Sequence, residues 1–280
     1  MHKITFTCET ITPMFLAGAD GSTPELRAPS IKGALRFWWR ALNGHLSLKE
    51  LKEQEGEIFG NTEQRSRVMI RVLQKQLDTK LQQVLVHRDS GFRKEAFTEK
   101  QAFDIVLGMP KELELEIKNL FVLVCALGGF GNRCRRGFGS ITIKKIKEDT
   151  GFLFPTTLET LYRFLKPENY KLINNKIISI NQKGSKYPYI KEIEIGKASA
   201  TILKKIGETT HEVNKEAGWD YGLSLGQAHG GRFASPIYVS TLTTLRGLCP
   251  IITTLNTVPP KLPHKVQPKL QASFKNKILY

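Results

Sequence analysis

The stretch PKELELEIKNLFVLVCALGGFGNRCRRGFGSITIKKI, residues 110–146, decides the fold, because it joins a helix, a glycine-rich loop and a strand in direct succession. Pro110 is followed by three glutamates near the positive end of the predicted helix and by apolar residues at intervals of three and four. Gly128 and Gly129 end this helix. Residues 140–146 then alternate apolar and polar side chains, which is typical of a strand with one buried face.

The segments upstream of this stretch complete an order of strands and helices. Residues 3–11 alternate as a strand, and residues 30–42 carry one apolar face at helical spacing. Residues 67–73 alternate again, and we expect them to pair with a second short strand at 82–89. The resulting order of strand, helix, strand, strand, helix, strand is that of a ferredoxin-like α+β unit, which closes at about residue 148.

The second half of the chain has a less regular pattern. Its periodic segments are strands at 177–180, 189–196 and 235–242, and a helix at 199–216. From Val258 onward Pro and Lys are frequent, which predicts a basic C-terminal arm or an edge strand. Two prolines and a polar tail in residues 151–171 favour a domain boundary there. We therefore expect one domain at 1–150 and a second, degenerate α+β domain at 151–280.

The chain carries a large positive charge. Its 280 residues include 42 Lys and Arg against 26 Asp and Glu, which gives a formal net charge of +16 at pH 7. The self-repulsion of such a chain is costly unless a polyanion neutralises part of it, and nucleic acid is the commonest such partner. A proteome rich in lysine is the alternative explanation, so the placement of the arginines has to decide.

The cysteines and the apolar segments exclude several classes of protein. Cys8, Cys125, Cys134 and Cys249 are scattered without a CxxC pair, which indicates neither a disulfide framework nor a zinc site. No segment approaches the length of a membrane-spanning helix, and the N-terminus has no apolar signal core. We therefore expect a cytoplasmic protein without a metal or another cofactor.

The predicted helix at 30–42 carries a row of cations. Lys32, Arg36 and Arg40 recur every four residues, which places them on one side of the helix, and no carboxylate occurs among them. Like charges at this spacing repel each other unless an anion lies across the row. The row therefore predicts a phosphate-binding surface, and a solvated helix face is the alternative.

The glycine-arginine loop, which we define as residues 128–140, is more specific. It combines five glycines, among them Gly131, with Arg133, Arg135 and Arg136. Glycine lets backbone amides approach an anion, and the arginine guanidinium binds phosphate through paired hydrogen bonds. The two phenylalanines in the loop either stack on unpaired bases or pack in the core, and the sequence leaves both open.

Other chemistry finds less support in the sequence. A dinucleotide-binding GxGxxG pattern would need glycine where Cys134 stands, and a Walker GxxxxGK[ST] motif is absent. Arg67 and Arg71 share one face of the predicted strand at 67–73, which makes them either a secondary site for RNA or part of a solvated strand edge. His229 is the histidine best placed to act as a general base in a metal-independent endoribonuclease that processes precursor RNA. A subunit that only bridges other proteins is a third hypothesis.

Four segments of the first half resemble a known family. Residues 11–20, 25–42, 58–72 and 128–141 are similar to subunit one of the Cmr complex, the type III-B CRISPR effector, in the RAMP superfamily. Residues 230–240 are similar to an Arg-x-x-Ser-Pro segment of the same family.

The resemblance implies two ferredoxin-like modules and a place in a multi-subunit, RNA-guided complex of antiviral defence. It implies a position at the end that holds the 3′ part of the CRISPR RNA, a role in capturing target RNA, and target cleavage by other subunits. By matching position it adds Trp39 and Arg232 to the candidate contacts with CRISPR RNA, target RNA or neighbouring Cmr subunits. We therefore expect a non-catalytic RNA-binding subunit.

Overall fold

The computed structural model describes residues 1–73, 76–86, 91–181, 186–218, 220–227, 233–256, 258 and 266–280. Its first sheet has four antiparallel strands in the order β2-β5-β1-β6. Their bounds are β1 His2–Thr10, β2 Met69–Leu73, β5 Ala102–Met109 and β6 Ile141–Ile146. The predicted alternation in β1 is confirmed, because Ile4, Phe6 and Cys8 are buried between more exposed neighbours.

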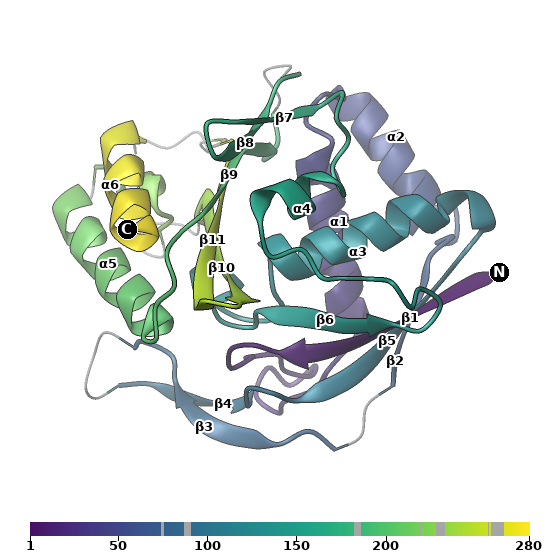
Figure 1. The fold of residues 1–280 in the computed structure, drawn as a ribbon, viewed down its shortest axis with the longest axis horizontal. Helices are drawn as coiled ribbons and strands as arrows, with labels where there is room; N and C mark the ends of the chain where they lie inside the picture. The colour runs from purple at the N-terminus through teal and green to yellow at the C-terminus, as the bar shows by residue number, and fades with distance from the viewer. Residues whose placement is uncertain are drawn as a thin grey trace.

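Helices α1 (Ala28–Leu42) and α3 (Glu114–Leu127) lie on one side of this sheet, as Figure 1 shows. The amphipathic pattern predicted for α1 is confirmed, since Ile31, Leu35 and Trp38 are buried on its inner face. By contrast, α3 is buried around nearly its whole circumference from Leu120 onward. It contacts β6 of the first sheet and also β10 and β11 of the second sheet, so apolar side chains are needed on more than one face.

The strand pair predicted at 67–73 and 82–89 is wrong. In the structure β2 pairs with β5, whose run of buried apolar residues makes it an inner strand of the sheet. A separate hairpin of β3 (Thr79–Gln83) and β4 (Arg93–Phe97) lies below the first sheet in Figure 1. Residues 87–90 lie outside the described residues.

Helix α2 (Leu48–Phe59) was not expected from the sequence. Its signal is present in the sequence as a capping box, in which the Ser47 side chain accepts from the Glu50 amide and the Glu50 side chain accepts from the Ser47 amide. Among its inward-facing residues is Glu55, which is only 6% exposed. This carboxylate pairs with Arg36 and Arg40 of α1.

The second sheet is antiparallel, in the order β10-β11-β9-β8-β7. Its strands are β7 Tyr170–Ile173, β8 Lys176–Ser179, β9 Ile190–Ile195, β10 Ile237–Thr244 and β11 Gly247–Leu255. The helices of this half are α4 Leu158–Tyr162, α5 Ile202–Ala217 and α6 Pro268–Leu279. The predicted strands and the predicted helix of this half are confirmed, with ends shifted by a few residues.

The basic arm predicted for the C-terminus is wrong over residues 268–279, which form α6. Leu270, Phe274 and Ile278 recur every four residues and pack α6 into a small core together with α5, β10 and β11. Lys269, Lys275 and Lys277 therefore lie on a helix. Lys261 and Lys265 lie outside the described residues.

The main hydrophobic core crosses the predicted boundary at residue 150. It contains Phe121 of α3 together with Ile193 of β9 and Ile251 of β11, so both sheets contribute to one apolar cluster. The chain is thus a mixed α/β protein with two principal antiparallel sheets, and its division at residue 150 stays a prediction. Within the described ranges, no helix has the length and apolar character needed to cross a membrane.

Candidate nucleic-acid interface

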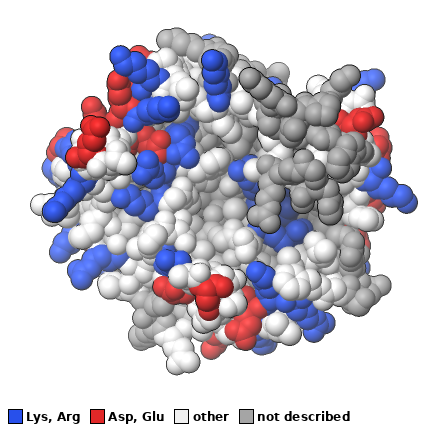
Figure 2. Space-filling view, turned by 180° about the vertical axis from the view of Figure 1, so that it is seen from behind, with Lys and Arg blue, Asp and Glu red and all other residues white. Residues whose placement is uncertain are grey.

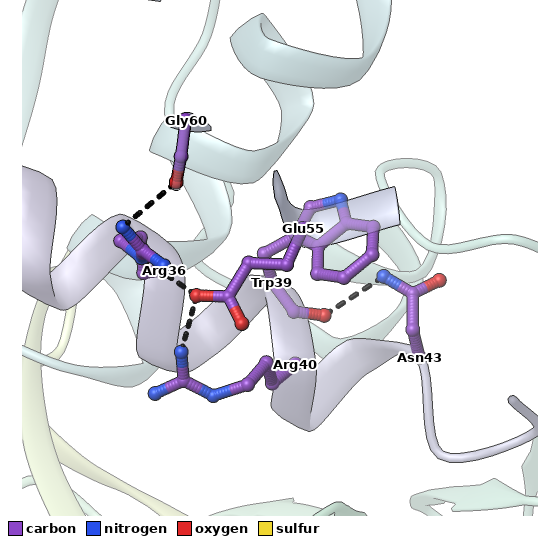
Figure 3. A network of polar contacts seen from close by, with 6 residues as sticks. All are labelled: Arg36, Trp39, Arg40, Asn43, Glu55 and Gly60. Carbon is purple, nitrogen blue, oxygen red and sulfur yellow. Dashed lines mark hydrogen bonds and ion pairs between the residues drawn. The ribbon is translucent and has the colours of Figure 1, made fainter. Parts of the chain in front are cut away.

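The basic row of α1, defined as Lys32, Arg36 and Arg40, has a carboxylate partner that the sequence analysis did not expect. Glu55 of α2 accepts from Arg36 Nε at 2.6 Å and from Arg40 Nη1 at 2.5 Å with the same oxygen. Arg36 Nη1 also donates to the Gly60 carbonyl at 3.3 Å. Figure 3 shows the two guanidinium groups converging on Glu55. The row has no carboxylate on α1 itself, but α2 supplies one across it.

A signal for this partner exists in the sequence of α2. Glu55 follows Leu51 by four residues and precedes Ile58 and Phe59 by three and four, so it lies on the apolar face of its helix. A carboxylate at such a position predicts a buried partner, because an unpaired buried charge is costly.

One carboxylate does not neutralise the row. Arg36 and Arg40 share Glu55 and keep 37% and 35% of their side chains exposed. Among the described residues, Lys32 makes no ion pair, and burial, followed by the charge of Arg36, lowers the pKa of its ammonium group. Lys32 and Arg36 line an open cleft of about 600 Å³ together with residues 59–66, which include Arg65. The surface of α1 therefore remains positive.

Trp39 does not belong to this surface. Its side chain is 3% exposed, and its indole N–H donates to Glu116 Oε1 of α3 at 2.8 Å. The prediction of an RNA contact at Trp39 is therefore at odds with its place in the core. Its position on the helix predicts this, because Trp39 follows Leu35 by four residues on the apolar face.

The glycines of the glycine-arginine loop are required by the chain itself. Gly131 has φ of +86° and Gly139 has φ of +65°, where a side chain is strained. A Cβ on Gly131 would overlap the Phe15 carbonyl, and a Cβ on Gly139 would overlap the Phe130 carbonyl. Gly131 thus permits close packing of backbone on backbone, and nothing in its surroundings requires an anion.

The two phenylalanines of the loop pack in the core. Phe130 and Phe138 are each 2% exposed. Phe130 joins the main core, and the Phe138 ring lies 5.1 Å from that of Phe15, centroid to centroid. The question that the sequence left open is therefore decided in favour of packing and against base stacking.

Arg136 connects the loop to the second half of the chain. Its guanidinium group is buried and donates to the carbonyls of Leu225 at 2.6 Å and Ile237 at 3.0 Å, and to Ser235 Oγ at 3.1 Å. Burial, together with the nearby charges of Arg133 and Arg135, lowers its pKa to about 9, so the group is still charged at neutral pH. Because its donors are used inside the protein, Arg136 is a structural residue and no longer a candidate for contacting phosphate.

Arg135 is only partly committed to the protein. Its Nη1 donates to the Ser235 carbonyl, and the guanidinium group lies 4.6 Å from the Tyr238 ring centroid and 5.3 Å from that of Phe37 on α1. These contacts hold a partly exposed cation beside α1.

Arg133 is the least satisfied cation of the loop. It adopts a left-handed conformation with φ of 61°, and its buried Nε has no hydrogen-bond partner. Burial lowers its pKa, and within the described residues no carboxylate pairs with it. Its guanidinium group lies 6.0 Å from the Phe138 ring centroid. A strained, unpaired cation at a half-buried position is suited to bind an anion from outside the chain.

The remaining candidates are dispersed. Arg67 precedes β2 and pairs with Glu112, whereas Arg71 is exposed on β2 at the edge of the first sheet. Arg232 and His229 lie outside the described residues. Within the described ranges, no group of three or more His, Cys, Asp or Glu side chains could hold a metal ion.

The face of the molecule in Figure 2 combines these features. Helix α1 lies behind α3 in Figure 1 and hence on the side toward the viewer in Figure 2. Lys and Arg side chains border a shallow hollow of uncharged surface on its left and right there, and a smaller group of Asp and Glu side chains lies below it. Such a surface fits a polyanionic strand.

The sequence and the fold agree with those of a known class of proteins, the RAMP superfamily. The sequence pattern of the RAMP superfamily matches residues 7–142. The crystal structure of Cmr1 from Pyrococcus furiosus has a TM-score of 0.67 at 21% identity and covers 99% of this chain and 96% of that chain. A chain of the type III-B Cmr-beta complex bound to cognate target RNA has a TM-score of 0.61 at 12% identity, covering 99% of each chain.

Relatives in Pyrococcus furiosus make the assignment more specific. Cmr subunit Cmr1-2 is 30% identical over 188 residues, which cover 53% of this chain and 98% of that protein. Cmr subunit Cmr1-1 is 34% identical over 170 residues, which cover 52% of this chain and 50% of that protein. The chain belongs to the Cmr1 family of the RAMP superfamily and is a type III-B CRISPR effector subunit.

Proposed function

We propose that this chain is a non-catalytic RNA-binding subunit of a Cmr complex, which holds the 3′ part of the CRISPR RNA and helps to capture target RNA in antiviral defence. Its partners are then the CRISPR RNA, the single-stranded target RNA and the other Cmr subunits. The structure of Cmr-beta bound to cognate target RNA supports this proposal by its similarity of fold.

The charge balance of the basic face carries the proposal. Five partly exposed cations contribute to α1 and the loop: Lys32, Arg36, Arg40, Arg133 and Arg135. Among the described residues, Glu55 is the one carboxylate that forms ion pairs with any of them. Cations that the protein leaves uncompensated can neutralise the phosphates of a nucleic acid. This releases the counterions condensed on the nucleic acid and so favours binding. RNA is therefore the partner that this surface fits best.

A binding experiment tests the RNA interaction directly. Fluorescence anisotropy with a fluorescein-labelled oligouridylate should show binding by the wild-type protein. The double variant Lys32→Gln, Arg133→Gln should bind on the order of tenfold more weakly, because two phosphate contacts are lost.

The matched control removes the same charge elsewhere. Lys171 on β7 and Arg246 in the turn between β10 and β11 are exposed, and the double variant Lys171→Gln, Arg246→Gln should keep nearly wild-type affinity. An equal loss in both double variants would mean that net charge, and not this face, binds the RNA.

The two alternative functions predict other results. An endoribonuclease would cut the labelled RNA without metal, and His229→Ala would stop the cutting while leaving binding intact. A subunit that only bridges proteins would assemble into the complex but show no RNA affinity alone. We expect binding without cleavage.

The position along the CRISPR RNA needs the assembled complex. A CRISPR RNA that carries 4-thiouridine near its 3′ end should crosslink to this chain upon irradiation, whereas one labelled near the 5′ end should not. Crosslinking only from the 5′ label would contradict the proposed place in the complex.

A further inference from the structure

Gly33 lies on the exposed side of helix α1, which runs through it without a break. Glycine is less favourable than alanine inside a helix, because it loses more backbone freedom on folding. A Cβ built on Gly33 meets no atom of the chain within 4 Å, and its φ lies outside the left-handed region. Neither packing within the described chain nor backbone conformation therefore requires a glycine at this position.

Other glycines of the molecule show the contrast. A Cβ on Gly44 would lie 2.6 Å from Tyr189 Cβ, and one on Gly128 would lie 2.5 Å from Trp38 Nε1. These two glycines are explained by close approach of another part of the chain. At Gly33, by contrast, the space that a side chain would fill is open. A glycine there therefore points to close approach of the backbone by a molecule outside the chain.

The surroundings of Gly33 indicate what approaches. Residues three and four positions along a helix are surface neighbours, so Gly33 lies next to Arg36 and Phe37. The Arg135 guanidinium lies over the Phe37 ring. The exposed backbone at Gly33 therefore has Arg36 of the basic row one turn along the helix, and Phe37, which carries Arg135 over its ring, beside Arg36.

We infer that the sugar-phosphate backbone of the bound RNA lies in van der Waals contact with the main chain of α1 at Gly33, with its phosphates directed toward Arg36 and Arg135. This inference rests on the RNA-binding function proposed above and adds the path of the strand. The glycine permits the approach, and the arginines supply the charge.

Two substitutions at this position separate steric from electrostatic effects. Gly33→Ala and Gly33→Leu add volume without changing charge, and both residues favour helix more than glycine does. The melting temperature should stay the same or rise. Oligouridylate affinity should fall about threefold for alanine and more than tenfold for leucine. The slope of log K against log salt should stay that of the wild type, because no ionic contact is lost.

Gly151→Ala is the matched control, since a Cβ there meets only Asp149 Oδ1, at 3.9 Å. It should leave RNA affinity unchanged. Wild-type affinity in both Gly33 variants would overturn the inference while leaving the RNA-binding function intact. A lowered melting temperature would also overturn it, because the space at Gly33 would then be occupied by the chain. Absence of RNA binding by the wild-type protein would instead overturn the proposed function.

Discussion

Arg133 and Arg136 lie three residues apart in the glycine-arginine loop, yet their surroundings differ. Arg136 is buried, and its guanidinium group donates to carbonyl and hydroxyl oxygens within residues 225–237. Arg133 is strained, and its Nε has no acceptor. The two residues should therefore respond differently to substitution.

Replacing Arg136 with methionine should lower the free energy of unfolding by about 3 kcal/mol, because the Leu225 carbonyl would stay buried without the donor that Arg136 supplies. The Ile237 carbonyl would keep only its hydrogen bond from Ser235 Oγ. Urea denaturation measures this. A loss below about 1 kcal/mol would show that water or another side chain satisfies the Leu225 carbonyl once Arg136 is removed.

Arg133→Gly should instead leave stability unchanged and weaken RNA binding. Glycine relieves a left-handed conformation that costs about 1 kcal/mol for other residues, so the free energy of unfolding should not fall. RNA affinity should fall, and the slope of log K against log salt should become shallower by about 1. If stability fell as much as in Arg136→Met, Arg133 would be structural as well.

At the scale of the elements, Glu55 joins α2 to the basic row of α1. Glu55→Gln should lower the free energy of unfolding by about 2 kcal/mol, because Arg36 and Arg40 lose their shared carboxylate, although their partial exposure moderates the cost. The same change should raise RNA affinity several-fold, since it removes the negative charge at the face.

Glu53→Gln on the same helix is the control, because its pair with Lys49 at 3.9 Å is exposed. It should change neither stability nor affinity by much. Weaker RNA binding in Glu55→Gln would mean that Glu55 positions the two arginines for RNA.

Lys275 docks α6 onto the second sheet. It pairs with Glu192 and, at 2.7 Å, with Glu194, and Lys176 pairs with the same carboxylates. Burial of Glu192 raises its pKa, but hydrogen bonding and charge from Lys275, with further charge from Lys176, outweigh burial, so its pKa lies below the ordinary value of 4.5. The pair therefore stabilises the fold above pH 4.5 and loses this contribution as the pH falls through the lowered pKa.

Lys275→Met should cost about 2 kcal/mol of unfolding free energy at pH 7, where the carboxylates are charged. The difference from the wild type should shrink below about pH 4. Urea denaturation at both pH values measures it, and a pH-independent difference would show that Lys275 acts through packing of its aliphatic stem.

At the scale of the whole molecule, the distribution of charge matters more than its total. If the five cations of the face bind phosphates, the slope of log K against log salt for oligouridylate should be about −3.5. A slope near −10 would mean that most of the net charge of +16 takes part, and binding would then be diffuse. Anisotropy titrations over a series of KCl concentrations distinguish the two.

The sequence by itself determined the elements whose signal is local. The alternation in β1 and β6, the apolar faces of α1 and α5, and the end of α3 at Gly128 follow from side-chain spacing and backbone preference within a few residues. The resemblance of residues 25–42 and 128–141 to the Cmr1 family was also readable from the sequence. These features need no knowledge of what lies across the fold.

The tertiary structure alone decided the partners. It paired β2 with β5 instead of with its neighbour in sequence, because strand pairing is a contact between distant segments that local periodicity does not encode. It placed Glu55 against Arg36 and Arg40, and it buried Arg136 while leaving Arg133 without an acceptor. A charge is available to a ligand only where the folded chain leaves it unpaired, and that depends on residues far away in the sequence.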